Sequence, residues 1–309
     1  MIDTVRLSTT AKPTSEQIRW HWRKREDTPA RQTSLTQYYY NPERDSGIPL
    51  RATYRPESRQ GHDQFLLEFS MPRILYGCNW PLISDIATAV VAADDLIKAL
   101  DALPDLPSTA EMSLSRLDIC YNYEVGSLIP YYIQALARLD YPHRTTCQFN
   151  AETVEFRAKS VKCKFYDKCA ESKCEAPAGL LRHEITMHNA RQVKNALGFN
   201  KPVTLADLTF PMLQHQLETD LQRLGIFGKP FATVNIAAER LIAKYGPGRG
   251  GYRFTILTMY QDRERGQICG QLPISRNTLN RYLSDIRKAG LPLALSDADH
   301  PLPPLQVIL

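Results

Sequence analysis

The chain has 309 residues, of which 43% are hydrophobic and 9% aromatic, and its formal net charge at pH 7 is +5. This composition excludes wholesale disorder, and the length favours one large domain accompanied by a smaller one. The pI near 8.8 is compatible with a polyanionic partner but does not identify one, because many enzymes share so small a charge.

No segment predicts a membrane span. The most apolar region, residues 83–100, is interrupted by three aspartates and Lys98 and is typical of an amphipathic helix. The first residues include Asp3 and lack the apolar run of a secretory signal. Seven cysteines, an odd number, fit a reducing compartment. We therefore expect a cytoplasmic protein without a membrane partner.

The first seventy residues predict strands joined by long polar connections. Residues 2–7 alternate apolar and polar side chains, and residues 64–70 place large apolar side chains on one face and Glu68 on the other. Between them, residues 20–31 interleave cations with tryptophans, a composition that suits phosphates and unstacked bases. Arg23 and Lys24 are the DNA contacts predicted there. An exposed helix whose tryptophans pack on the domain explains the same composition.

Two helices are predicted before residue 140. The first covers residues 84–103 and ends before Pro104 and Pro107, because proline cannot continue the helical hydrogen bonds. The second, residues 128–139, lies between strands. This order of strands and helices predicts an α+β fold, with helices packed on an antiparallel sheet.

The candidate catalytic and binding residues lie on three predicted strands, which cover residues 115–123, 162–168 and 182–187. Their period of two separates an apolar from a polar face. The polar faces carry, in chain order, Arg116, Asp118, Lys162, Lys164, Tyr166, Lys168, Arg182, Glu184 and Thr186. If the strands are neighbours in one sheet, two carboxylates, a tyrosine and several cations meet on one surface. That combination suits metal-assisted attack of a tyrosine hydroxyl on a phosphodiester.

Each of these residues also has a structural explanation. Tyr166 fits a half-buried strand tyrosine, the commoner fate of tyrosines. Asp118 and Glu184 fit ion pairs with Arg116 and Arg182. 

The cysteines raise the alternative of a zinc site. Cys163, Cys169, Cys174 and His183 are the possible ligands, but they lack a tight Cys-x2-Cys pair. Cys163 should also face the core if Tyr166 faces outward. We therefore predict scattered free thiols.

After residue 191 the pattern becomes helical. Residues 212–224 are amphipathic, and the glycine-rich residues 246–251 predict a mobile basic loop, because the Gly-Lys-Ser/Thr end of a P-loop is missing. Residues 275–287 predict a helix, because Ser275 is a candidate cap and the apolar residues Leu279, Tyr282, Leu283 and Ile286 recur at helical spacing. Its polar outer face is typical of a helix-turn-helix recognition helix. The side chains expected to approach DNA are Arg276, Asn277, Asn280 and Arg281. An ordinary surface helix explains that face equally well.

Five short motifs in order resemble the gene II and gene X type replication initiators of filamentous bacteriophages. They are residues 1–7, residues 68–79, Arg-Leu-Asp-Ile at 116–119, Phe-Tyr-Asp-Lys at 165–168 and Leu-Arg-His-Glu-Ile at 181–185. Their order is similar to that of staphylococcal plasmid rolling-circle initiators. The resemblance spans roughly residues 1–200 and predicts a nickase domain there, followed by a helix-turn-helix-like DNA-binding domain at 201–309.

The resemblance implies a sequence-specific nickase and ligase in the cytoplasm of a bacterial host cell. Such an enzyme cuts one strand of double-stranded replicative-form DNA at the origin and holds the 5′ phosphate on a tyrosine. It leaves a 3′ hydroxyl for a host polymerase, works with a host helicase, and rejoins the displaced single strand. The matching positions are Tyr166 for the nucleophile and Asp118 and Glu184 for the acids. A homodimer is compatible with this function.

The His-hydrophobic-His metal motif of other rolling-circle initiators is absent, so oxygen ligands for Mg²⁺ or Mn²⁺ are expected. Glu68 and His183 are alternatives for a third ligand. Lys164 and Lys168 would favour the tyrosine phenolate and steady the phosphate oxygens, because a free tyrosine hydroxyl is a weak nucleophile. Two other functions stay open: a non-catalytic DNA-binding regulator, and a relaxase of a mobile element with the same chemistry. We also expect Arg116 and Arg182 to contact DNA.

Overall fold

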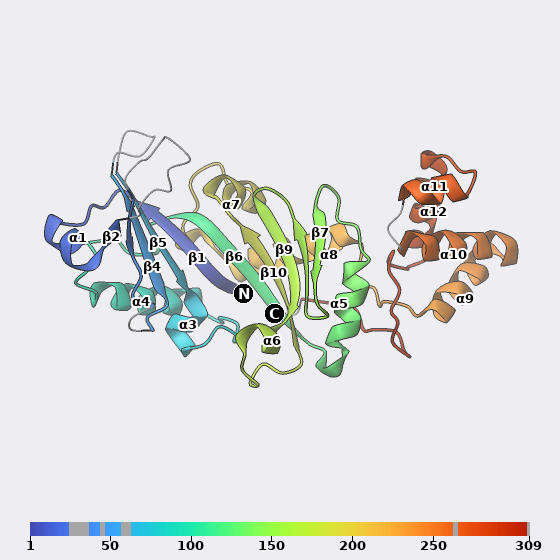
Figure 1. Ribbon diagram of the computed structural model, residues 1–309, viewed down its shortest axis with the longest axis horizontal. Coiled ribbons are helices and arrows are strands. Elements are labelled where there is room, and N and C mark those ends of the chain that lie inside the picture. The colour runs from blue at the N-terminus through green and yellow to red at the C-terminus, as the bar shows by residue number, and fades with distance from the viewer. Residues whose placement is uncertain (25–36, 44–46, 57–62, 262–264, 308–309) are drawn as a thin grey trace. The chain divides into compact units, whose positions relative to one another are not determined.

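The computed structural model describes residues 1–24, 37–43, 47–56, 63–261 and 265–307 (Figure 1). Its architecture is α+β, as the sequence predicts: helices accompany a ten-stranded sheet in the order β2-β3-β4-β5-β1-β6-β10-β9-β8-β7. The strands are β1 Ile2–Thr9, β2 Arg23–Lys24, β3 Tyr38–Tyr40, β4 Leu50–Arg55, β5 Gln64–Ser70, β6 Ser113–Glu124, β7 Thr145–Phe149, β8 Thr153–Arg157, β9 Val161–Asp167 and β10 Leu180–Met187.

The helices become more frequent toward the C-terminus. They are α1 Ser15–His21, α3 Met71–Tyr76, α4 Ile86–Lys98, α5 Ile129–Ala137, α6 Lys168–Ser172, α7 Ala190–Leu197, α8 Phe210–Leu224, α9 Val234–Tyr245, α10 Pro247–Gln261, α11 Arg265–Gln271 and α12 Arg276–Lys288. Short 3-10 turns occupy Gly126–Leu128 and Leu205–Asp207. Within the described part of the chain, no helix is long and apolar enough to cross a membrane.

The chain divides into two compact units. Unit 1 comprises Met1–Cys120 and Ile185–Leu213, and unit 2 comprises Tyr121–Glu184 and Gln214–Leu309. The division falls within β6, β10 and α8. A functional boundary near residue 200 stays a prediction.

Unit 1 is built around β1, which pairs antiparallel with β5 on one side and β6 on the other. The alternation of its sequence is reproduced, because Ile2, Val5 and Leu7 are fully buried. Helix α4 begins at the cap Asp85, whose carboxylate accepts from the Ala87 amide at 2.9 Å. It ends at Lys98, earlier than the predicted residue 103, and a turn fills the remaining residues before the prolines.

Unit 2 contains the antiparallel strands β7, β8 and β9. Their register separates two faces: Phe156 lies opposite Cys163 on the apolar face, and Glu155 lies opposite Lys164 on the polar face. Helix α5 confirms the predicted helix at residues 128–139. Helix α8 confirms the predicted helix at 212–224.

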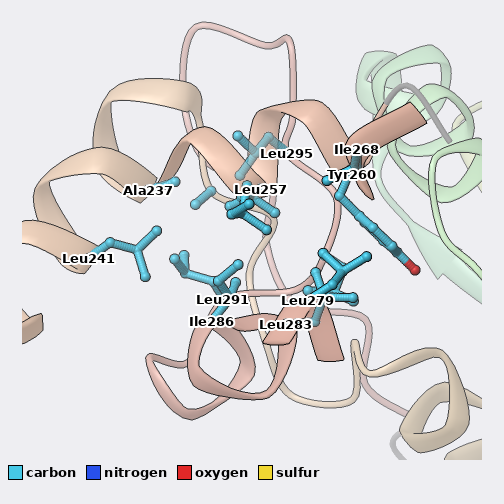
Figure 2. Close-up of a cluster of buried hydrophobic side chains, with 13 residues drawn as sticks. Ala237, Leu241, Leu257, Tyr260, Ile268, Leu279, Leu283, Ile286, Leu291 and Leu295 are labelled. Atoms are coloured by element: carbon cyan, nitrogen blue, oxygen red, sulfur yellow. The ribbon is translucent and has the colours of Figure 1, made fainter. Parts of the chain in front are cut away.

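The last four helices of unit 2 share an apolar core (Figure 2). Leu241 of α9, Leu257 of α10 and Leu283 of α12 are buried in it. The predicted spacing of apolar residues in α12 is therefore confirmed. Ser275 caps this helix by accepting from the Thr278 amide at 3.2 Å.

The prediction of a mobile loop at residues 246–251 is wrong. Gly246 ends α9 with a φ of 81°, and α10 begins at Pro247. A Cβ on Gly250 would lie 2.5 Å from the carbonyl oxygen of Leu241, too close for any other residue without a backbone shift. The glycine at this position therefore allows α10 to approach α9.

Candidate functional site

The predicted nucleophile, Tyr166, forms a hydrogen bond with a predicted acid. Tyr166 lies near the end of β9, and Glu184 lies in β10, the neighbouring strand of the sheet. The hydroxyl of Tyr166 donates to Glu184 Oε2 at 2.9 Å. The other carboxylate oxygen of Glu184 lies 3.3 Å from the ammonium of Lys164. These three side chains form what we call the tyrosine site.

Two ammonium groups approach the ring of Tyr166. Lys164 Nζ lies 4.0 Å and Lys168 Nζ 5.6 Å from the ring centroid. Lys164 shares the face of Tyr166 by strand alternation, as predicted. Lys168 instead begins α6, which Asp167 caps by accepting from the Cys169 amide at 2.9 Å. Lys168 is fully buried and donates to Glu171 at 2.5 Å. Both ammonium groups make cation–π contacts with the ring.

Glu184 is held in its ionised form. Burial raises the pKa of this carboxyl, but the Lys164 ammonium and the hydrogen bond from Tyr166 outweigh burial, so the pKa lies below its usual value. An ionised Glu184 is an acceptor only. It therefore orients the hydroxyl proton of Tyr166 toward itself and can take up that proton.

The expectation that these polar faces lie open to solvent is wrong. Tyr166 is only 2% exposed, and Arg182, Glu184 and Thr186 of β10 are all buried. Arg182 donates through Nε to Asn122 Oδ1 at 2.8 Å, an internal contact. Alternation identifies which side chains share a face, but the cover over that face comes from the tertiary fold.

The other predicted acids, Asp118 and Glu68, lie in unit 1. Arg116 donates two hydrogen bonds to Asp118, from Nε to Oδ1 at 3.0 Å and from Nη2 to Oδ2 at 2.6 Å. Arg116 also lies 3.4 Å from Glu68, which accepts from Arg6 Nε at 2.6 Å. The alternative of an ion pair between Asp118 and Arg116 is thus observed. We call these four side chains the carboxylate cluster.

The carboxylate cluster fits a hard divalent cation in donor type, because Asp118 and Glu68 supply carboxylate oxygens on one face of unit 1. Arg116 now supplies the positive charge between them. Binding of Mg²⁺ or Mn²⁺ there requires Arg116 to release Asp118. Glu184 belongs to the other unit, and its participation at the same ion stays a prediction.

The sequence reasoning missed Asp220. This acid of α8 is buried. Its carboxylate contacts several side chains of unit 2. Tyr141 donates to its Oδ1 at 2.6 Å, His183 Nε2 lies 3.0 Å from its Oδ2, and Arg144 lies 3.5 Å away. The signal was present: Asp220 interrupts the leucine stripe of α8, and an acid in an apolar stripe needs buried partners.

Cys163 completes this group, with its sulfur 3.6 Å from His183 Nε2. In the described part of the chain, Cys163, His183 and Asp220 form a group of three ligand-type residues whose ligand atoms all lie within 4.8 Å of one another. Burial raises the pKa of the Cys163 thiol well above its usual value, and Arg144 lies 3.5 Å from the Asp220 carboxylate. The three side chains contact one another as a buried hydrogen-bonded group. Cys169 and Cys174 are no part of this group, and the seven cysteines, all within the described residues, form no disulfide.

The predicted DNA contacts outside the sheet centre are exposed. Arg23 and Lys24 form the short strand β2, and residues 25–31 of the basic segment lie outside the described residues. The outer face of α12 is exposed at each predicted position, namely Arg276, Asn277, Asn280 and Arg281. The exposure agrees with a recognition helix, and the role itself stays a prediction.

No protein-family model and no curated protein matches the chain. Among solved structures, it is similar to a rolling circle replication initiator protein from Geobacillus stearothermophilus, at 13% identity and a TM-score of 0.38. The match covers 72% of this chain and 84% of that one. A TM-score this low carries no argument about activity.

Proposed function

We propose that this chain is a rolling-circle replication initiator of the filamentous-phage gene II type, which nicks and rejoins DNA through Tyr166. The observation that supports it is the hydrogen bond from Tyr166 to an ionised Glu184, with Lys164 and Lys168 at the ring. A phenol bonded to a carboxylate beside two cations is arranged to lose its proton to that carboxylate. The motif positions of these residues agree with this role.

The proposed reaction exchanges one phosphodiester for another. The Tyr166 oxygen bonds to the scissile phosphorus as its proton passes to Glu184. The 3′ oxygen leaves with the electrons of the broken P–O bond and takes a proton from water. Rejoining is the reverse, attack of a 3′ hydroxyl on the phosphotyrosine, and it consumes no ATP because the bond energy is conserved. Since Tyr166 is only 2% exposed, the side chains that cover its hydroxyl must move before the DNA strand can reach it.

The deciding experiment uses supercoiled replicative DNA of the element that encodes the chain. The protein is incubated with this DNA and Mg²⁺ or Mn²⁺, and the products are separated on a denaturing gel. A nicked strand with protein attached to its 5′ end supports the proposal. Unmodified circles with every metal contradict it.

A divalent ion is the second part of the proposal. Asp118 and Glu68 would hold it, and when bound it would polarise the scissile phosphate. We predict that EDTA abolishes nicking and that Asp118→Asn raises the Mg²⁺ concentration needed for half-maximal nicking by at least tenfold, because an oxygen site loses affinity with each carboxylate removed. Metal titrations of nicking rate measure this shift.

Asp101→Asn is the matched control for Asp118→Asn, because Asp101 is an exposed aspartate of unit 1. It should leave the metal titration unchanged. Full nicking by the wild type in EDTA would exclude a metal-assisted reaction. Glu184→Gln separates the two acids: we expect it to lower the rate even at saturating Mg²⁺, since it removes the proton acceptor of Tyr166.

We further propose that α12 reads the duplex origin. Its exposed arginines and asparagines suit base edges in the major groove. Arg276→Ala or Arg281→Ala should cost ~1–3 kcal/mol of specific duplex binding. Competition against unrelated duplex measures that loss. The control is Arg223→Ala, which removes an exposed arginine of α8. If these variants lose equal affinity for origin and for unrelated DNA, α12 contacts phosphates and does not read bases.

The second candidate function is a non-catalytic DNA-binding regulator. The burial of Tyr166 favours it, because a closed hydroxyl cannot attack DNA without a conformational change. A regulator binds origin duplex through α12 but forms no covalent adduct. The same denaturing gel therefore separates the two functions.

A further inference from the structure

Unit 1 contains two adjoining hollows that share a wall. The first, of about 400 Å³, is lined by Trp20 and Arg23, and the second, of about 500 Å³, by Arg55 and Glu68. Residues 39–41 line both hollows. The polar face of the unit 1 sheet is therefore hollowed next to the basic and aromatic segment.

The registers of the strands place a series of polar and cationic side chains on this face. Arg23 lies opposite Tyr39, which lies opposite Thr53 on β4. Two residues along β4, Arg51 lies opposite Glu68, which in turn lies opposite Arg6. Arg6 lies opposite Arg116, the partner of Asp118. We call this face, from Trp20 to Asp118, the cationic track.

The charge of the cationic track is positive. Its arginines are Arg6, Arg23, Arg51, Arg55 and Arg116. They outnumber its acids, Glu68 and Asp118, even when Glu43, which pairs with Arg51, is added. Arg51 is 60% exposed despite that pair. An excess of guanidinium groups over carboxylates on a hollowed surface suits a chain of phosphates.

Trp20 gives the track a stacking surface. It is 67% exposed at the last turn of α1, the most exposed of the large apolar side chains in the described residues. Trp22, two residues on, is buried instead and donates from its indole to the Ala102 carbonyl at 2.9 Å. The helix is therefore anchored by one tryptophan while the other stays open. An exposed ring beside cations accepts an unstacked base, whereas the bases of a duplex are stacked on each other.

We propose that the cationic track binds single-stranded DNA and leads it from Trp20 across β3, β4, β5 and β1 to the carboxylate cluster. This inference rests on the proposed function for the role of the cluster, but not for the binding itself. Five strand spacings separate β2 from β6, about 24 Å at the ordinary spacing of ~4.8 Å. A short oligonucleotide therefore suffices to occupy the track.

The test measures binding of labelled dT12 by anisotropy in the full-length chain. Trp20→Ala should weaken binding about five- to hundred-fold, because one base loses its stacking partner. Trp20→Phe keeps an aromatic face and should restore most of the affinity. Arg55→Gln should reduce the slope of log affinity against log salt by about 0.7, the value for one phosphate on a single strand.

Tyr131→Ala is the matched control, since Tyr131 is an exposed aromatic residue of α5 in unit 2. It should leave dT12 binding unchanged. Unchanged dT12 affinity in Trp20→Ala would overturn the proposal. The proposal would also be overturned if Trp20→Ala lost as much affinity for a dT12·dA12 duplex as for dT12, because the surface would then bind the phosphates of single and double strands alike. If the wild type binds dT12 through Trp20 but forms no covalent adduct with DNA, the cationic track is supported and the proposed nickase activity is contradicted.

Discussion

Tyr166→Phe is expected to abolish nicking and the covalent protein–DNA adduct while leaving origin binding near normal. Phenylalanine keeps the ring against Lys164 and Lys168 and removes only the attacking oxygen. The fold should survive, because Glu184 keeps its ion pair with Lys164 and the lost hydrogen bond to a charged group costs about 1.5–3 kcal/mol. Denaturing gels measure the adduct, and mobility shifts measure binding.

The control for this variant is Tyr121→Phe, which removes a hydroxyl from a half-buried tyrosine of β6. It should nick at the wild-type rate. An adduct of undiminished yield in Tyr166→Phe would place the nucleophile elsewhere, with Tyr121 and Tyr123 tested next. Loss of both adduct and origin binding would instead indicate a structural role for Tyr166.

Much of the local structure follows from the sequence. The two-residue period places Lys164 and Tyr166 on one face and Cys163 on the other, and the register of β8 and β9 agrees. Ser275 and the leucine spacing of α12 likewise predict that helix and its exposed face. These features depend on neighbouring residues alone, so local patterns contain them.

The burial of the tyrosine site could not be predicted from the sequence. Tyr166 is 2% exposed, and alternation says nothing about what lies above a face. Lys168 left the strand pattern because Asp167 caps a helix there. Gly250 was misread for a related reason, since the glycine serves contact with Leu241 and not chain mobility. The errors at Tyr166 and Gly250 concern contacts whose partners cannot be read from the local pattern, whereas the cap at Asp167 is a local signal that the strand pattern obscured.

Asp220→Asn is expected to destabilise the chain by about 3–5 kcal/mol, the ordinary cost of removing one partner from a buried ion pair. Arg144 and Asp220 are both nearly inaccessible, and Tyr141 and His183 also contact the carboxylate. An amide leaves the charge of Arg144 without its counter-ion. Urea unfolding followed by circular dichroism measures the loss. Asp297→Asn is the matched control: it breaks a surface pair with Arg138 and should cost less than about 1 kcal/mol.

The pH dependence of the free energy of unfolding distinguishes the loss of the Asp220 charge from a change in packing. Burial raises the pKa of Asp220, but the hydrogen bond from His183 and the charge of Arg144 outweigh burial, so the folded pKa is lowered. Its stabilisation is therefore complete above the unfolded pKa of about 3.9 and is lost as pH falls through the folded value. The difference between wild type and Asp220→Asn should shrink in acid. A difference that stays constant with pH would mean that packing, and not the carboxylate charge, is responsible.

Asp220 also bears on where a nicking fragment should end. His183 and Cys163 lie directly beside Glu184 and Lys164 in β10 and β9, so the contact with α8 holds the strands of the tyrosine site from their apolar face. A fragment ending at residue 200 lacks Asp220, and three buried polar side chains then lose their shared acceptor. We therefore move the expected end of the nicking fragment from residue 200, the boundary predicted from the sequence, to a point after Gly225. The fragment that includes α8 should nick single-stranded origin oligonucleotides, and the one that ends at residue 200 should unfold. Equal nicking by both fragments would show that the tyrosine site does not depend on Asp220.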